Sequence, residues 1–199
     1  MGSSNSSFRV LLITDGFDDD TPNRVAAALG ELDGAAVQLR AKRLDGAALF
    51  AAARKLRAVA PVLVVNDRVD VALAAGAYGV HLPARGVPIA DARRLVGAGI
   101  VGVSTHTRDE AIAAARAGAD YVVFGPVWPT GEKRAAVGVD ALADVVRACA
   151  PMPVFALGGV DADRARAVIS VGARVACIGA VLGRSDAAAG ARALAAAIG

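Results

Sequence analysis

Short apolar runs alternate eight times with longer alanine-rich stretches along this chain of 199 residues. Several of the apolar runs are continuous, which is typical of parallel strands that are covered on both faces. The stretches between them carry charged residues at helical spacing, and their alanine content favours helix. The pattern therefore predicts eight strand–helix units in succession.

The same pattern gives approximate bounds for each predicted element. The strands are predicted at residues 8–15, 35–40, 62–67, 78–83, 100–106, 121–127, 153–160 and 174–182. The helices are predicted at residues 22–32, 46–58, 69–75, 88–97, 108–117, 139–150, 162–171 and 187–198. Most of the chain is thus assigned to repeated units, and no linker or low-complexity segment divides it.

Eight such units predict an α/β fold, a single-domain (β/α)8 barrel of the TIM-barrel class that spans residues 8–199. The small polar residues 1–7 are expected to be loosely ordered. A doubly wound open sheet is the alternative architecture, but its edge strands would carry more polar residues.

Composition narrows the classes of partner. The net charge is +3 and aromatic residues make up 4%, so scattered cations and few stacking side chains argue against nucleic acid as a partner. Every apolar run is shorter than the roughly 20 residues of a membrane span, and the first residues lack the features of a secretory signal. We expect a cytoplasmic protein that acts on small molecules, and the sequence is compatible with a homo-oligomer.

In a barrel of this class, ligands bind at the carboxyl ends of the strands, so polar residues there are candidate contacts. Two glycine-containing turns, Gly158-Gly159 and Gly179-Ala180, follow the seventh and eighth strands, where such barrels commonly bind phosphate. Glycine lets an anion approach the backbone amides closely. The alternative is that both are ordinary turns.

Three polar residues alternate along the second strand, namely Gln38, Arg40 and Lys42. A period of two directs all three to one side, where Arg40 and Lys42 could hold a phosphate or diphosphate and Gln38 could contact a neutral ring. Departure of Lys42 into solvent is the simpler alternative.

Other strand ends offer oxygen and nitrogen atoms. Asn66 and Asp67 could help to bind Mg²⁺, or Asp67 could cap the third helix. His81 and His106 could be structural or catalytic. Further candidates follow the fifth and sixth strands: Ser104, Thr130 and Lys133.

Six short motifs in order resemble the thiamine phosphate synthase and thiazole tautomerase family across nearly the whole chain. They are Gln38-Leu39-Arg40-Ala41-Lys42, Val65-Asn66-Asp67, Gly79-Val80-His81-Leu82, Gly102-Val103-Ser104-Thr105-His106, Phe124-Gly125-Pro126-Val127-Trp128-Pro129-Thr130 and Ala156-Leu157-Gly158-Gly159-Val160.

The resemblance implies a transferase that joins hydroxymethylpyrimidine diphosphate to thiazole phosphate and releases diphosphate. By position, it implies that Arg40, Lys42, Asn66 and Lys133 surround the diphosphate, with Asp67 as a Mg²⁺ ligand. It places Gln38, Ser104 and His81 among the substrate contacts. Thiazole phosphate would be held by Thr130 and the turns that contain Gly158, Gly159, Gly179 and Ala180.

The chain departs from the synthase pattern in two places. Where synthases have His-x-Gly-Gln-x-Asp after the fourth strand, this chain has His81-Leu82-Pro83-Ala84-Arg85-Gly86, so a second Mg²⁺ ligand is missing. Glu132 precedes Lys133 where the pattern has Thr. The alternatives are a metal-independent thiazole tautomerase-like isomerase and a catalytically weak protein that binds thiazole or thiamine phosphate. A further hypothesis is that Arg85 replaces part of the Mg²⁺ charge at the diphosphate.

Overall fold

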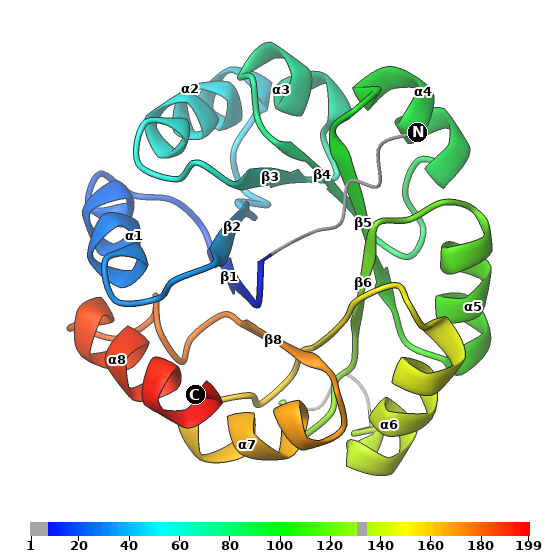
Figure 1. The fold of residues 1–199 in the computed structure, drawn as a ribbon. Helices are drawn as coiled ribbons and strands as arrows, with labels where there is room; N and C mark the ends of the chain where they lie inside the picture. Colours follow the sequence, from blue (N-terminus) through cyan, green and yellow to red (C-terminus); the bar gives the residue numbers. More distant parts are fainter. Residues whose placement is uncertain (1–7, 131–134) are drawn as a thin grey trace.

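The computed structural model, which describes residues 8–130 and 135–199, is a closed ring of eight parallel strands in sequence order, surrounded by helices (Figure 1). This confirms the predicted (β/α)8 barrel and rules out the open sheet. The strands are β1 (Val10–Ile13), β2 (Ala35–Leu39), β3 (Leu63–Asn66), β4 (Gly79–Leu82), β5 (Ile100–Thr105), β6 (Tyr121–Phe124), β7 (Val154–Ala156) and β8 (Arg174–Cys177).

One helix follows each strand. The helices are α1 (Thr21–Leu29), α2 (Gly46–Arg57), α3 (Val69–Ala74), α4 (Ile89–Val96), α5 (Arg108–Arg116), α6 (Gly138–Cys149), α7 (Ala162–Ser170) and α8 (Ala187–Ile198). The largest departures from the predicted bounds are at the ends of β7 and β8. Both strands stop early because the glycine-containing segments after Ala156 and Cys177 form turns.

Alternation along the strands divides the apolar residues into two layers. Residues such as Leu12, Val37 and Val65 lie in the large cluster with the helix residues, between the strands and the helices. The other set fills the barrel interior and includes Phe8, Leu11, Ile13, Ala36, Val64, Ile100, Tyr121, Val123, Phe155 and Ala176. Both faces of each strand are therefore buried, which explains the continuous apolar runs.

Large rings fill the amino-terminal part of the interior. The ring centroids of Phe8 and Phe155 lie 5.4 Å and 5.3 Å from that of Tyr121. Gly102 provides the space for Tyr121, because a Cβ at this position would lie 2.0 Å from Tyr121 Cζ. Since this end is packed with side chains, a ligand can enter the barrel only from the carboxyl ends of the strands.

In the part of the chain that the structure describes, no helix has the length and apolar character needed to cross a membrane.

Candidate active site

Two adjoining cavities open at the carboxyl ends of the strands. The barrel-mouth cavity has a volume of about 470 Å³ and lies over β5 to β8; its lining includes Ser104, His106, Thr130, Gly158, Gly159 and Gly179. The side cavity, of about 1090 Å³, lies among the loops after β1, β2 and β8. Arg40, Ile178 and Gly179 line both, so the two cavities meet at the ends of β2 and β8.

Backbone amides are available for hydrogen bonding at both glycine turns. Within the described residues, no hydrogen bond from the Gly159 or Gly179 amide is seen. The Gly159 turn is held from behind, because Arg164 Nη1 donates to the Gly159 carbonyl at 2.7 Å while its guanidinium stacks on Trp128. Gly159 has a φ of +65°, and this backbone conformation by itself favours glycine.

Gly179 differs from Gly159 because no contact among the described residues requires a glycine there. A Cβ at Gly179 would meet no atom within 4 Å, and its φ lies outside the left-handed region. The space that a side chain would fill belongs to both cavities. An anion at this point could therefore approach the backbone directly.

Arg40 follows β2 at the meeting point of the cavities. Its Nη1 donates to Asp15 Oδ1 at 2.8 Å, and its side chain is 26% exposed against 75% for that of Asp15. Thr14 Oγ1 both accepts from the Arg40 amide and donates to its carbonyl, which fixes the backbone. A solvent-exposed ion pair of this kind contributes about 0–1 kcal/mol to stability. Asp15 accepts from one N–H group, so it orients the guanidinium and leaves the other donors of Arg40 available.

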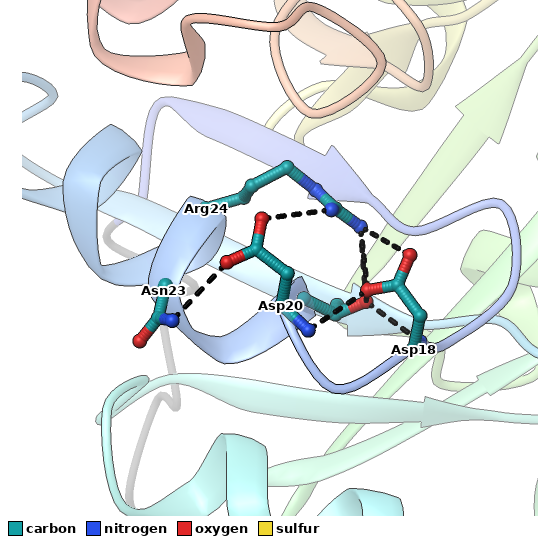
Figure 2. A network of polar contacts seen from close by, with 5 residues as sticks. Asp18, Asp20, Asn23 and Arg24 are labelled. Atoms are coloured by element: carbon teal, nitrogen blue, oxygen red, sulfur yellow. Dashed lines mark hydrogen bonds and ion pairs between the residues drawn. The ribbon is translucent and has the colours of Figure 1, made fainter.

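The charge of Arg24, in the wall of the side cavity, is compensated by neighbouring carboxylates. Figure 2 shows its guanidinium between Asp18 and Asp20, with Asn23 donating to Asp20. The nitrogen–oxygen distances are 2.9 Å to Asp18 and 3.1 Å to Asp20. Hydrogen bonds from Thr21 and then from Arg24 lower the pKa of Asp18 below its usual value. This network of ion pairs and hydrogen bonds stabilises the loop after β1.

Three other cations line the side cavity: Lys42, Arg43 and Arg184. Among the described residues none of them forms an ion pair, and all three are exposed. With Arg40, they make the side cavity attractive to an anion.

Gln38 lies inside the barrel, 2% exposed, with one polar atom unpaired. Its Nε2 donates to Asn66 Oδ1 at 2.9 Å, whereas its buried Oε1 has no hydrogen-bond partner in the described residues. An unpaired buried acceptor costs about 1–3 kcal/mol, which a ligand that donates to it would offset.

His81 is buried in β4 and bonded at both ring nitrogens. Nδ1 lies 3.1 Å from the Tyr121 hydroxyl and Nε2 lies 2.9 Å from Ser104 Oγ. Burial lowers the pKa of His81 to about 3 and raises that of Tyr121. Both rings are therefore uncharged at neutral pH, and the chain of contacts ends at Ser104 in the barrel-mouth cavity.

His106, which from the sequence could be structural or catalytic, also lines the barrel-mouth cavity. Its Nδ1 lies 2.7 Å from the Gly125 carbonyl, which can only accept, so Nδ1 carries the proton. The His106 amide donates to Glu110 Oε2, and Glu110 also closes the capping box of α5 with Thr107. The start of α5 thus fixes this histidine at the cavity wall.

The remaining predicted site residues are distributed as follows. Lys42 lines the side cavity alone, whereas Gln38, Asn66, Asp67, His81 and Ala180 line neither cavity. Arg85 is exposed and also lines neither, so the geometry offers no support for its proposed contact with diphosphate. Lys133 lies outside the described residues.

Asp67 is not the cap of α3, contrary to one of the sequence interpretations. The N-cap residue is Arg68, which makes no side-chain capping hydrogen bond. Asp67 instead has a φ of 68°, in the left-handed region that few residues other than glycine adopt. This backbone conformation holds an exposed carboxylate at the end of β3.

The described residues do not fit a Mg²⁺ site built by the protein alone. They include no group of three or more His, Cys, Asp or Glu side chains that could hold a metal ion. The Oδ1 atom of Asn66, the neighbour of Asp67, already accepts from Gln38. One carboxylate binds Mg²⁺ only where ligand oxygens complete the coordination.

Sequence analysis overlooked Arg43, Arg184 and Tyr121. The predicted eighth strand ran to residue 182 whereas β8 ends at Cys177, so the loop that carries Arg184 into the side cavity is longer than predicted. Gly102 indicates that a large side chain lies beside it in the barrel. That this side chain is Tyr121 follows only from the register between β5 and β6.

The buried histidine predicts a pH dependence of stability. Its pKa is lower in the folded chain, about 3, than the usual 6.5, so below pH 6.5 the unfolded chain binds a proton that the folded chain does not. Protonation of His81 in the unfolded chain should therefore lower the free energy of unfolding by about 2 kcal/mol as the pH falls from 7 to 5. Denaturant titrations of the wild type and His81→Gln at both pH values measure the difference. Equal losses in the two proteins would show that His81 binds a proton in the folded state.

Comparison with known proteins agrees with this arrangement. The thiamine monophosphate synthase family matches residues 10–181. A putative thiamine-phosphate synthase of Geobacter sulfurreducens is 43% identical over 198 residues, covering 94% of this chain and 92% of the relative. A thiamine-phosphate synthase of Methanoculleus marisnigri is 44% identical, covering 84% and 82%.

A solved structure has the same architecture. The thiamine phosphate pyrophosphorylase of Pyrococcus furiosus superposes with a TM-score of 0.86 at 31% identity, covering 98% of this chain and 96% of its own. Since the family match extends from β1 to the loop after β8, this chain belongs to the thiamine monophosphate synthase family.

Proposed function

We propose that this protein is a transferase that makes thiamine phosphate from hydroxymethylpyrimidine diphosphate and thiazole phosphate. The bond between the pyrimidine methylene carbon and the diphosphate oxygen breaks, and a bond from that carbon to the thiazole nitrogen forms. Diphosphate leaves with the electron pair of the broken bond. The observation that carries the proposal is the junction of the two cavities, which Arg40 and Gly179 both line.

Two anionic groups have to be bound near one another for this reaction. Arg40 and Lys42, which line the side cavity, are proposed to hold the diphosphate, with Lys133 as a further proposed contact. As the carbon–oxygen bond breaks, negative charge accumulates on the leaving diphosphate. Fixed cations that face this group stabilise the charge without reorganising, which lowers the barrier.

The barrel-mouth cavity is proposed to hold the thiazole phosphate. The unpaired amides of Gly159 and Gly179 would donate to the phosphate, with Gly158 and Ala180 in the same two turns and Thr130 in the loop after β6 as further proposed contacts. Binding the phosphate here and the diphosphate at Arg40 places the two reacting atoms between them. Such positioning replaces an encounter in solution by a reaction within one complex.

The pyrimidine is proposed to lie between Gln38 and Ser104. The unpaired Gln38 Oε1 would accept a hydrogen bond from an amino group, and Ser104 presents a hydroxyl to the barrel-mouth cavity. Asn66 and His81 hold these two side chains by direct hydrogen bonds.

Asp67 is proposed as a single Mg²⁺ ligand, with oxygens of the substrate diphosphate completing the coordination. The ion would supply positive charge beside the leaving group.

A coupled assay of the purified protein tests the proposal. With both substrates present, the synthase forms thiamine phosphate and releases one diphosphate for each molecule. A thiazole tautomerase changes the absorption of its thiazole carboxylate substrate alone, and a binding protein does neither while its melting temperature still rises with ligand. Either of the last two results contradicts the proposal, and repeating the assay with chelator measures the requirement for Mg²⁺.

Arg40→Ala should lower kcat/KM about 10- to 100-fold, because a charge-assisted hydrogen bond contributes about 1.5–3 kcal/mol. Arg54→Ala is the matched control, since Arg54 is exposed on α2 and lines neither cavity. Initial rates at varied pyrimidine diphosphate concentration give the comparison. An equal loss of kcat/KM in both variants would show that Arg40 does not contact the substrate.

Gly179→Ala should raise the KM for thiazole phosphate by about 3- to 10-fold, as expected for one weakened hydrogen bond. The unfolding free energy should change little, since the added methyl group has no neighbour within 4 Å. Steady-state kinetics at saturating pyrimidine diphosphate, together with denaturant titration, separate the two effects. An unchanged KM would place the phosphate elsewhere.

A further inference from the structure

A chain of hydrogen bonds connects the closed interior of the barrel with the barrel-mouth cavity. It runs from the Tyr121 hydroxyl to His81 and from His81 to Ser104. Tyr121 and His81 are 0% and 1% exposed, whereas Ser104 is half-buried and lines the cavity. The proposed function uses Ser104 and His81 but leaves Tyr121 without a role.

The position of the Tyr121 hydroxyl is fixed on several sides. Gly102 leaves the space for the ring, and a Cβ there would lie 2.4 Å from the hydroxyl oxygen itself. The rings of Phe8 and Phe155 pack edge to face against Tyr121. Within the described residues the only hydrogen bond of this hydroxyl is the one with His81 Nδ1.

This restriction decides where the protons lie. A neutral imidazole carries one N–H and one unprotonated nitrogen. If Nδ1 carried the proton, the Tyr121 hydroxyl would accept it and its own buried hydrogen would have no acceptor, which costs about 1–3 kcal/mol. Tyr121 therefore donates to Nδ1, and the proton of His81 resides on Nε2.

The tautomer of His81 in turn fixes Ser104. Because Nε2–H donates to Ser104 Oγ at 2.9 Å, the Ser104 hydroxyl hydrogen is not used in this bond. Among the described residues no acceptor for that hydrogen is seen. The hydrogen is thus free to point into the barrel-mouth cavity, where a ligand atom can accept it.

We infer that Tyr121 is a positioning residue that sets the His81 tautomer and thereby makes Ser104 a hydrogen-bond donor toward the ligand. This inference rests on the proposed function for the identity of the acceptor, a ring nitrogen of the pyrimidine. Gln38 supplies the complementary acceptor. Together they match an amino group beside a ring nitrogen, the edge that an aminopyrimidine presents.

Nitrogen-15 NMR of the histidine rings tests the proton positions without any substrate. The chain contains two histidines, so a spectrum of His106→Gln identifies the His81 signals. We expect a single neutral tautomer with the proton on Nε2. A proton on Nδ1, or comparable populations of the two tautomers, would overturn the inference whatever the enzyme does.

A double-mutant cycle tests the effect on Ser104. Tyr121→Phe should raise the KM for pyrimidine diphosphate about 3- to 10-fold and leave that for thiazole phosphate unchanged. In a Ser104→Ala background the same substitution should have no further effect, because Tyr121 acts through Ser104. Tyr78→Phe is the matched control, since Tyr78 is the only other tyrosine and is 46% exposed.

The outcomes separate the inference from the proposed function. Additive effects of Tyr121→Phe and Ser104→Ala would show that Tyr121 has only a structural role and would overturn the inference. A wild-type protein without synthase activity would contradict the proposed function, and the NMR result would still decide the tautomer.

Discussion

Closure of eight parallel strands into one ring is the constraint on which the site depends. All carboxyl ends then lie at the same rim, and alternate residues of every strand point into a shared interior. Gln38 thus lies inside the barrel, and Arg40, two residues later, lies at its mouth. Among the described residues, Phe8, Tyr121 and Phe155 fill the interior at the amino-terminal end, so a ligand is expected to approach from the rim at the carboxyl ends. Strand closure therefore brings side chains from separate repeats to one place at the rim.

The polar atoms inside the barrel are arranged for a ligand with both donors and acceptors. Tyr121, His81 and Ser104 satisfy one another in sequence, whereas Gln38 Oε1 is buried and unpaired. Neighbouring cations and open backbone amides add positive potential at the rim. The site thus combines a neutral hydrogen-bonding interior with a mouth of positive potential, an arrangement that suits a substrate with an uncharged ring on a phosphate or diphosphate.

Sequence periodicity was sufficient for the eight repeated units and for the side of β2 on which Gln38 and Arg40 lie, because both depend on local pattern. The barrel then followed from the number of units. Periodicity could not place Asp67, whose positive φ turns it away from capping α3. It also could not pair Tyr121 with His81, because that contact requires the β4–β5–β6 register and the missing side chain of Gly102. The loop that carries Arg184 is longer than the apolar residues indicate, because β8 ends at Cys177, before the turn at Gly179. Contacts between distant repeats are thus the part that pattern alone does not determine.

We expect two anion subsites from different repeats to meet at one rim of the barrel. A crystal structure of the protein soaked with inorganic diphosphate and thiazole phosphate would locate both anions. Diphosphate should lie against Arg40 and Lys42, and the ester phosphate on the amides of Gly159 and Gly179. Density for either anion at the amino-terminal end of the barrel, or an ester phosphate remote from both glycines, would contradict this expectation.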